Sequence, residues 1–221
     1  MAIIRHKGDY TALDASVLER WKGVPPAVAG DCLNRTASMA GRVSPLHPDM
    51  RIIGHARTIR VMAGDNACVH AAIPLMRPGE IIVIDAGGNP DVAIIGEILV
   101  TAAKHRGVAG FVIDGAARDV AELRAGDVPV FASATVPAGP HKGFGGSIDG
   151  PISCGGVPVQ TGDLILGDAD GVTVVPLGQA AAILEAGEAH VRKETDMLAQ
   201  LAAGKTTAEM LGIEIPEVNA E

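Results

Sequence analysis

Residues 78–114 read PGEIIVIDAGGNPDVAIIGEILVTAAKHRGVAGFVID, and this stretch decides the fold that the sequence predicts. The apolar run 81–84 lies between two glycine-containing turns, which is typical of a strand buried on both faces. Residues 91–107 predict a helix, with three basic residues in the last turn and Gly107 where a C-terminal cap belongs. The apolar side chains at helical spacing are Ile95, Ile98, Leu99 and Ala102. A second apolar run follows at 110–114, and a strand, a helix and a strand in this order predict a parallel, right-handed crossover.

The flanking segments continue this α/β pattern. HARTIRV (55–61) and DVPVFASATVP (127–137) have strand character, and a short helix is expected from after Arg118 to about Arg124. Glycine accounts for 28 of the 221 residues, well above its usual share of about 7%. Many short strands joined by tight turns would use that much glycine.

The second half of the chain is rich in short strands and ends in helices. Residues 151–176 are short apolar runs broken by glycine turns, with DADG (168–171) predicted as a hairpin turn. Residues 178–204 show the amphipathic pattern of one long helix. Thr206 and Glu209 form a capping box for a last short helix.

Length and composition favour a single α/β domain over residues 1–221. With 48% hydrophobic residues, the chain can bury a sizeable core. We expect that core within about residues 24–176 and a helical segment at about 178–212.

Charge, aromatic content and cysteine usage exclude several classes of protein. The formal net charge is −8 and only 2% of the residues are aromatic, whereas nucleic-acid binding requires a basic face and stacking rings, so we expect no nucleic-acid partner. No apolar run reaches the roughly 18 residues of a membrane span, so we expect no membrane partner. The three cysteines form no CxxC pair, which favours a reducing, cytoplasmic location.

Common cofactor and nucleophile motifs are missing. The chain lacks GxGxxG at a strand–helix junction, GxxxxGK[ST] and GxSxG. Its seven histidines form no short pair of ligands, so a zinc site is unsupported. Lys142, in the glycine-rich GPHKGFGGS loop, could meet an anion, although a solvated loop lysine is the more ordinary interpretation.

The remaining chemistry lies in GFVIDGAARDVAE (110–122), where an apolar strand ends in charged residues. Asp119 and Glu122 lie three apart at the start of a helix, beside Arg118 and at the carboxyl end of a parallel strand, where ligand crevices occur. Hard cations such as Mg²⁺ bind one or two carboxylates and keep several waters. An arginine alongside would bind a carboxylate or ketone oxygen of a substrate that also chelates the metal, as a 2-oxo acid does.

A structural interpretation of the same residues stays open. Aspartate at a helix N-cap with glutamate three residues later, as in Asp119 and Glu122, is a common capping pair. Arg118 could then merely neutralise Asp114. Spacing alone does not decide between the metal site and the capping pair.

An ordered set of motifs extends from about Val24 to Gly212. Its marks are GHARTIRV (54–61), PGEIIVIDAGG (78–88), GEILVTAAKHRGVAGFVIDGAARDVAEL (96–123), PISCGGVPV (151–159) and TGDLILGDADGVTVVP (161–176). This set resembles the family that holds the regulator of ribonuclease E activity A and the class II 4-hydroxy-4-methyl-2-oxoglutarate aldolases. Members include 4-carboxy-4-hydroxy-2-oxoadipate aldolases and related oxaloacetate decarboxylases. The resemblance implies a swivelling β/β/α sandwich, assembled as a homotrimer or homohexamer with the site between subunits.

The aldolase branch of the family is marked by an acid, twenty residues and then Arg-Asp. Here Glu97 precedes twenty residues and then Arg118 and Asp119, although the pattern usually has aspartate at the first place. Members with Arg-Asp, two residues and then an acid match as far as Glu122. Regulators without catalysis tend to lack the metal-binding aspartate, which this chain keeps.

The resemblance implies a metal-dependent lyase that acts on pyruvate-like substrates. Asp119 would be the direct Mg²⁺ or Mn²⁺ ligand, and Glu97 and Glu122 would hold metal-bound waters. Arg118 would bind the 2-keto oxygen.

The resemblance also implies that the substrate carboxylate lies at a helix N-terminus. Backbone N–H groups near Gly96, Glu97 and Ile98 would bind it. The helix would then begin nearer Ile95 than Asp91, later than the apolar spacing indicates.

These groups fit one chemistry. Cleaving a 4-hydroxy-2-oxo acid, such as 4-hydroxy-4-methyl-2-oxoglutarate or 4-carboxy-4-hydroxy-2-oxoadipate, or decarboxylating oxaloacetate, leaves a pyruvate enolate. A divalent ion and Arg118 can both stabilise charge on the 2-keto oxygen. The alternative is a non-catalytic regulator that binds an RNA-degrading enzyme through its acidic surface, and the retained acids and arginine favour the enzyme.

Overall fold

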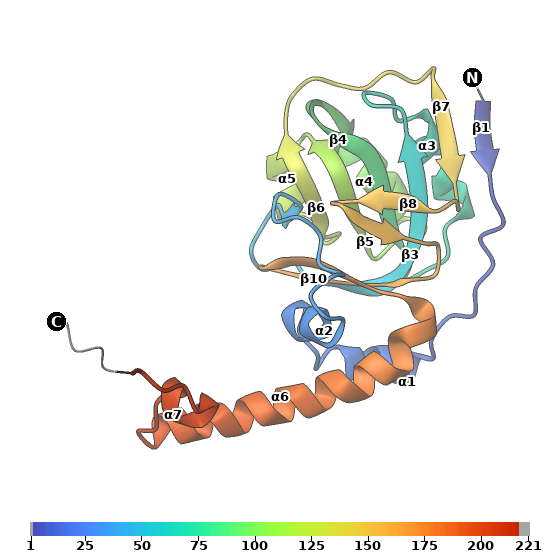
Figure 1. The fold of residues 1–221 in the computed structure, drawn as a ribbon. Coiled ribbons are helices and arrows are strands. Elements are labelled where there is room, and N and C mark those ends of the chain that lie inside the picture. Colours follow the sequence, from blue (N-terminus) through green and yellow to red (C-terminus); the bar gives the residue numbers. More distant parts are fainter. Residues whose placement is uncertain (1, 217–221) are drawn as a thin grey trace.

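The computed structural model describes residues 2–216, and a mixed sheet of nine strands forms its centre (Figure 1). The strands are β1 (Ala2–Arg5), β2 (Ser44–Pro45), β3 (Ile52–Val61), β4 (Ile81–Ile95), β5 (Gly110–Ala117), β6 (Val130–Thr135), β7 (Gly145–Ile148), β8 (Ile152–Cys154), β9 (Val157–Val159), β10 (Leu164–Asp168) and β11 (Gly171–Val175). The helices are α1 (Ala15–Trp21), α2 (Pro26–Cys32), α3 (Ala67–Ala72), α4 (Glu97–Lys104), α5 (Val120–Ala125), α6 (Ala180–Ala202) and α7 (Thr207–Leu211), with short 3₁₀ turns at Ile73–Leu75 and Leu177–Gln179. The strand order of the nine-stranded sheet is β1-β7-β3-β4-β5-β6-β2, and β10 joins β3 to β11, while β8 and β9 pair with each other in a separate two-stranded sheet.

Four parallel strands, β3 to β6, form the buried middle of this sheet. Every residue of β5 is buried, as are residues 81–84 of β4, because helices or loops cover both faces. The predicted order of strand, helix and strand is confirmed, with β4 and β5 parallel and α4 between them in sequence. The strands predicted at 55–61 and 127–137 are also confirmed.

The helix predicted over 91–107 begins later than its apolar spacing indicates, at Glu97. Residues 91–95 instead continue β4, and Ile95 pairs with Ala117 of β5. Ile98 is 79% exposed, so the predicted apolar stripe is not the buried face of the helix. The buried side chains of α4 are Leu99, Val100 and Ala103. Pairing with β5 therefore overrides the local helical spacing, since strand formation depends on the neighbouring strand.

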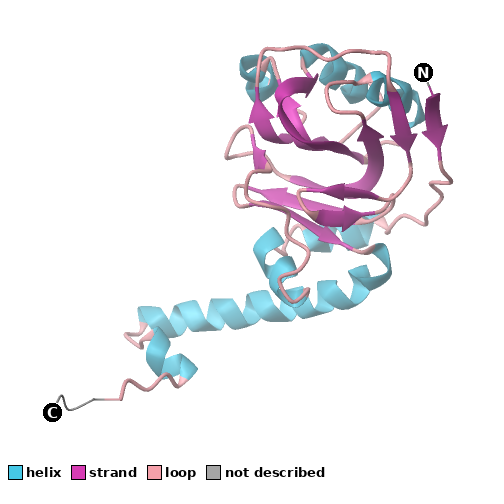
Figure 2. Ribbon diagram, turned by 45° about the horizontal axis from the view of Figure 1, so that its top comes forward, coloured by secondary structure: helices cyan, strands magenta, loops and turns pink. Residues whose placement is uncertain are grey.

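A layer of helices lies below strand β10 in the view of Figure 1. Strands β10 and β11 form the predicted hairpin at 168–171, and their outer apolar side chains pack against α1, α2 and the start of α6. Figure 2 shows the strands between these helices and the short helices on the other side. The fully buried Trp21 belongs to this second hydrophobic cluster.

The C-terminal helices agree with the sequence prediction. The 23-residue α6 is buried only in its first two turns, up to Gly187, and then extends away from the body (Figure 1). Thr206 and Glu209 form the predicted capping box at the start of α7. The mixed sheet with helices, in one domain with a C-terminal helix, confirms the expected α/β fold. None of the helices within residues 2–216 is both long and apolar enough to cross a membrane.

Candidate active site

The candidate site begins where β4 and β5 end side by side. Ile95 is the register partner of Ala117, so Gly96 and Arg118 leave the sheet as neighbours. The backbone N–H of Arg118 donates to the carbonyl of Ile95 at 3.0 Å, which holds the two strand ends together. This is the carboxyl edge of a parallel pair, the place where ligand crevices form in such sheets.

Asp119 joins the two strand ends through its side chain. Its Oδ2 accepts a hydrogen bond of 2.9 Å from the backbone N–H of Glu97, the first residue of α4. The N-cap position of α4 is Gly96, which has no side chain to satisfy that N–H. Asp119 therefore caps α4, a helix that starts 22 residues earlier in the chain.

The ordinary capping pair left open by the sequence is wrong. Asp119 stands at the N-cap of α5 but makes no side-chain hydrogen bond to that helix. Its backbone has φ 57° and ψ 45°, in the left-handed region, which aspartate adopts more readily than most residues. The unusual backbone directs the carboxylate to α4 rather than to its own helix.

Gly96 leaves room for this arrangement. A Cβ atom at this position would lie 2.3 Å from Asp119 Oδ2 and 3.0 Å from Arg118 Cγ. The glycine therefore permits the close approach of both functional side chains to the start of α4.

Arg118 does not neutralise Asp114, the other structural interpretation of the sequence. Asp114 is 6% exposed, and Arg42 binds it with Nη2 at 3.0 and 2.9 Å from the two carboxylate oxygens. Ser133 Oγ and the backbone N–H of Gly155 complete its hydrogen bonds. Arg42 comes from a distant loop, so no local spacing could have predicted this partner.

Arg118 instead stays at the site, with its side chain 41% exposed. Its Nε lies 3.7 Å from Asp119 Oδ2, which is a loose ion pair. The loop before β7 passes so close that a Cβ at Gly139 would lie 2.7 Å from Arg118 Nη1. The guanidinium is thus held between the strand end and this loop, with most of its N–H donors available to a ligand.

The opposite wall is built around Asp65 and Asn66, which no motif or spacing in the sequence selects. Asp65 is fully buried, and its carboxylate accepts backbone N–H groups from Ala67, Gly143 and Phe144 at 2.9, 2.6 and 3.1 Å. Burial acts to raise the pKa of Asp65, but these hydrogen bonds outweigh it and the pKa is lowered. A carboxylate that is ionised at neutral pH therefore ties the start of α3 to the loop before β7.

Asn66 presents an unsatisfied acceptor in this wall. Its Nδ2 donates to the carbonyl of Ile94 at 2.8 Å, which fixes the orientation of the amide. Its Oδ1 is buried without a hydrogen-bond partner among the described residues. A buried acceptor of this kind costs about 1–3 kcal/mol while it stays unpaired.

These two walls enclose a small cavity of about 100 Å³. Its lining residues are Asn66, His70, Ile94, Ile95, Gly96, Ile98, Leu99, Arg118, Asp119, Pro140 and Lys142. The structure thus brings together four residues that the sequence selected, Gly96, Ile98, Arg118 and Asp119, and adds Lys142, whose role the sequence left open. His70 was missed; burial and then the charge of Lys142 lower its pKa, so it is neutral at pH 7.

The other two acids lie beside the cavity rather than in its lining. Glu97 contributes its backbone N–H, and its side chain is exposed, as is that of Glu122 in the first turn of α5. Within residues 2–216, no three His, Cys, Asp or Glu side chains are placed to bind one metal ion together. The metal site expected from the sequence has one direct ligand, Asp119, and two acids that bind the ion through water. A half-exposed Asp119 with exposed acids beside it fits a hard cation that keeps several of its waters.

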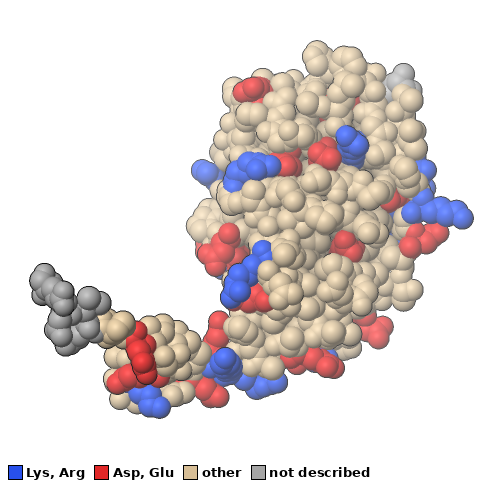
Figure 3. All heavy atoms as spheres, viewed as in Figure 1, with Lys and Arg blue, Asp and Glu red and all other residues tan. Residues whose placement is uncertain are grey.

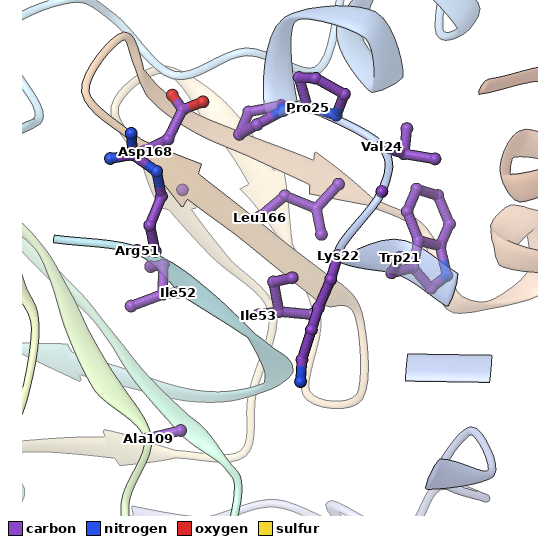
Figure 4. Close-up of a pocket in the computed structure, with 13 residues that line it drawn as sticks. Trp21, Lys22, Val24, Pro25, Arg51, Ile52, Ile53, Ala109, Leu166 and Asp168 are labelled. Atoms are coloured by element: carbon purple, nitrogen blue, oxygen red, sulfur yellow. The ribbon is translucent and has the colours of Figure 1, made fainter. Parts of the chain in front are cut away.

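A larger cavity of about 640 Å³ lies elsewhere, between the α1–α2 turn and strands β3 and β10 (Figure 4). Ile52, Ile53 and Leu166 form an apolar floor, and Figure 4 shows Arg51 and Asp168 facing each other at one end. None of the residues of the acid cluster lines it. Size alone therefore does not identify the site of chemistry here.

Comparisons with known proteins agree with this assignment of the fold. The chain is 42% identical over 168 residues to a protein of Halalkalibacterium halodurans, covering 76% of this chain and 80% of that protein, whose name provisionally assigns it as a 4-hydroxy-4-methyl-2-oxoglutarate aldolase. It is 36% identical over 126 residues to the 4-hydroxy-4-methyl-2-oxoglutarate aldolase of a Thermus thermophilus strain, covering 57% of this chain and 76% of that protein.

A solved structure and a family profile extend the likeness to the fold. Streptomyces coelicolor RraAS2, described as an unusual member of the RNase ES inhibitor RraA protein family, superposes with a TM-score of 0.77 at 27% identity, over 85% of this chain and 98% of that one. The profile of the RraA-like family, described as Aldolase/RraA, matches residues 15–174, well over half of the sequence. The chain therefore belongs to the RraA-like family.

Proposed function

We propose that this protein is a divalent-metal-dependent lyase that cleaves 4-hydroxy-2-oxo acids to pyruvate and decarboxylates oxaloacetate. The observation that supports this most strongly is the placement of Asp119 and Arg118 together at the capped N-terminus of α4, on one cavity. The names of the aldolase relatives point to the same reaction. 4-Hydroxy-4-methyl-2-oxoglutarate and 4-carboxy-4-hydroxy-2-oxoadipate are the candidate aldol substrates.

Each residue has a role in this proposal. Arg118 binds the 2-keto oxygen of the substrate and stabilises the negative charge that develops there as the pyruvate enolate forms. Because the N–H of Glu97 already donates to Asp119, the substrate carboxylate is bound by the neighbouring N–H of Ile98 at the positive end of α4. The side chain of Glu97 orients the water that takes the hydroxyl proton of an aldol substrate.

Asp119 would bind the Mg²⁺ or Mn²⁺ ion directly, and Glu97 and Glu122 would hold it through water. The bound ion would supply Lewis-acid stabilisation of the 2-keto oxygen, worth several kcal/mol. Asp119 Oδ2 is committed to the N–H of Glu97. Its other oxygen is the one that would face the cation.

Pyruvate release tests the proposal. Protein stripped with a chelator should release pyruvate from 4-hydroxy-4-methyl-2-oxoglutarate or oxaloacetate no faster than a sample without protein, and added Mg²⁺ or Mn²⁺ should restore catalysed release. Oxaloacetate decarboxylates slowly by itself with these metals, so the control is the same metal without protein. Full activity in the thoroughly stripped protein would refute metal dependence, and no activity with any metal would refute the enzyme.

A homo-oligomer, either a trimer or a dimer of trimers, is part of this proposal. Ile98 lines the cavity and is 79% exposed, and Phe144, the last residue of the loop before β7, is 59% exposed. Apolar side chains exposed beside a site are typical of a surface that a second copy covers. Light scattering at working concentration should give three or six times the mass of the chain, and a fully active monomer would contradict a site between subunits.

The second candidate is a regulator that binds an RNA-degrading enzyme, since the RraAS2 relative is described as belonging to a family of RNase inhibitors. Figure 3 shows Lys and Arg scattered among Asp and Glu on the visible face, with no continuous basic patch there. Such a surface, with a net charge of −8, fits a protein partner better than RNA itself. Inhibition of RNA cleavage by a purified ribonuclease of this type, without pyruvate release, would favour this candidate.

A further inference from the structure

The loop before β7, residues 136–144, is fastened to the cavity at several points along its length. The carbonyl of Ala138 accepts the N–H of Ala93 in β4 at 2.9 Å. The backbone N–H of His141 donates to the carbonyl of Gly64 at 2.8 Å, and the carbonyl of His141 accepts the backbone N–H of Asn66 at 3.1 Å. These contacts place Lys142 between two anchored residues rather than on a free loop.

Asp65 completes the fastening directly after Lys142. Its buried carboxylate accepts the N–H groups of Gly143 and Phe144, and the third hydrogen bond, from Ala67, fixes the start of α3. The same carboxylate therefore sets the position of Lys142 relative to Asn66 and His70 on α3. A rigid backbone support of this kind is what a binding side chain needs.

The side chains that line the cavity carry more positive than negative charge. Arg118 and Lys142 both line it, and Asp119 is the one acid among the lining residues. No carboxylate of the described residues lies within ion-pair distance of Lys142, whereas Asp119 is shared between Arg118 and the cap of α4. Lys142 and His70 line the same cavity, and the charge of Lys142 contributes, after burial, to the lowered pKa of the imidazole.

We propose that Lys142 binds the second carboxylate of a dicarboxylic 2-oxo substrate, and that Asp65 is the positioning residue that holds Lys142 over the cavity. This inference rests on the proposed function. The substrate's first carboxylate lies at the N-terminus of α4, and its far carboxylate lies against the loop that contains Lys142. The site thereby selects diacids over 2-oxo acids that have a single carboxylate.

The test compares a diacid with a monoacid that undergoes the same bond cleavage. The substrates are 4-hydroxy-4-methyl-2-oxoglutarate and 4-hydroxy-2-oxopentanoate, with kcat and KM measured for wild type, Lys142→Met, Asp65→Asn and Lys104→Met. Lys104 is the matched control, since it lies at the far end of α4 and pairs with the surface residue Asp127. A lost hydrogen bond to a charged group corresponds to a loss of roughly 10- to 100-fold.

For Lys142→Met we expect KM for the diacid to rise by about that factor, with little change in kcat or in either constant for the monoacid. Asp65→Asn should shift the same constant in the same direction by a smaller factor, because the loop loosens while the lysine remains. Lys104→Met should match wild type. A merely structural loss would lower kcat for both substrates alike.

The outcomes separate the inference from the proposed function. If wild type cleaves the diacid but Lys142→Met keeps the full preference for it, the role of Lys142 is refuted and the lyase stands. Equal loss on both substrates, in a variant that melts like wild type, also refutes selection by Lys142. If wild type cleaves neither substrate with any divalent metal, both the inference and the proposed function are overturned.

Discussion

The carboxylate of Asp119 caps the helix that starts at Glu97, with Oδ2 2.9 Å from the backbone N–H. This contact gives a physical reason for the spacing of the motif, in which twenty residues separate Glu97 from Arg118 and Asp119. The twenty residues are the rest of α4, a connecting turn and β5, which together return the chain to the point where α4 began. The first and last members of the motif are therefore neighbours, and Arg118 lies beside both.

Gly96→Ala should disrupt the site while leaving the fold intact. Its φ of −155° is extended backbone that alanine adopts freely, so no backbone strain is added. The new Cβ would however lie 2.3 Å from Asp119 Oδ2, forcing the carboxylate off the N–H of Glu97. We expect pyruvate release to fall at least about tenfold and the cap energy of about 1 kcal/mol to be lost.

The control for that variant is Gly178→Ala, since a Cβ there meets nothing within 4 Å and the residue lies in the turn before α6, outside the cavity lining. Its activity and melting temperature should match those of wild type. An active Gly96→Ala enzyme with unchanged metal affinity would show that the close contact is not needed.

Arg118→Ala should lower kcat by roughly 10²–10³, the loss observed on removing one donor to a developing oxyanion. Lysine keeps the charge but not the planar fork, so Arg118→Lys should stay impaired. Because Arg42 rather than Arg118 pairs with Asp114, neither change should alter thermal stability by much. Normal turnover in both variants would leave Arg118 without a catalytic role.

Asp65→Asn should change how stability depends on pH. The pKa of Asp65 is lowered from 3.8, so its carboxylate contributes stability that is fully present above that value and is lost as the pH falls toward its folded-state pKa. The asparagine variant should thus unfold more readily than wild type at pH 7, and the difference in free energy of unfolding should shrink as the pH falls below 3.8 toward the lower folded-state pKa. Urea denaturation at several pH values measures this, and a difference that stays constant with pH would contradict it.

Much of the fold could be predicted because its signals are local. The buried strands 81–84 and 110–114 are continuous apolar runs, the 168–171 hairpin has a glycine turn, and the capping box before α7 is a four-residue pattern. The start of α4 could not be predicted from spacing. Residues 91–95 resemble a helix in sequence, and only pairing with the end of β5 makes them a strand.

The sequence pointed to the residues at the end of β5 but not to those on the opposite side of the cavity. Arg118 and Asp119 follow a strand directly, so their place at its end could be read from order alone. Asn66 and His70 line the cavity at the start of α3 and within it, and Asp65 binds the loop before β7 beside them, contacts that exist only in the folded chain. The partner of Asp114 could not be predicted for the same reason, because Arg42 is 72 residues away in the sequence.

The variant Asp119→Asn separates a metal ligand from a helix cap. Asparagine keeps a side-chain oxygen that can accept from the N–H of Glu97, so the variant should melt at the temperature of wild type, whereas Asp119→Ala should lose about 0.5–2 kcal/mol of stability. The neutral amide is a poor ligand for a hard dication, so pyruvate release titrated with Mg²⁺ should collapse in Asp119→Asn although the fold survives. Thermal melting and the Mg²⁺ titration are done on the same samples. A folded Asp119→Asn protein that still turns over and saturates with Mg²⁺ like wild type would contradict metal binding by Asp119, and would leave this residue as the cap of α4 alone.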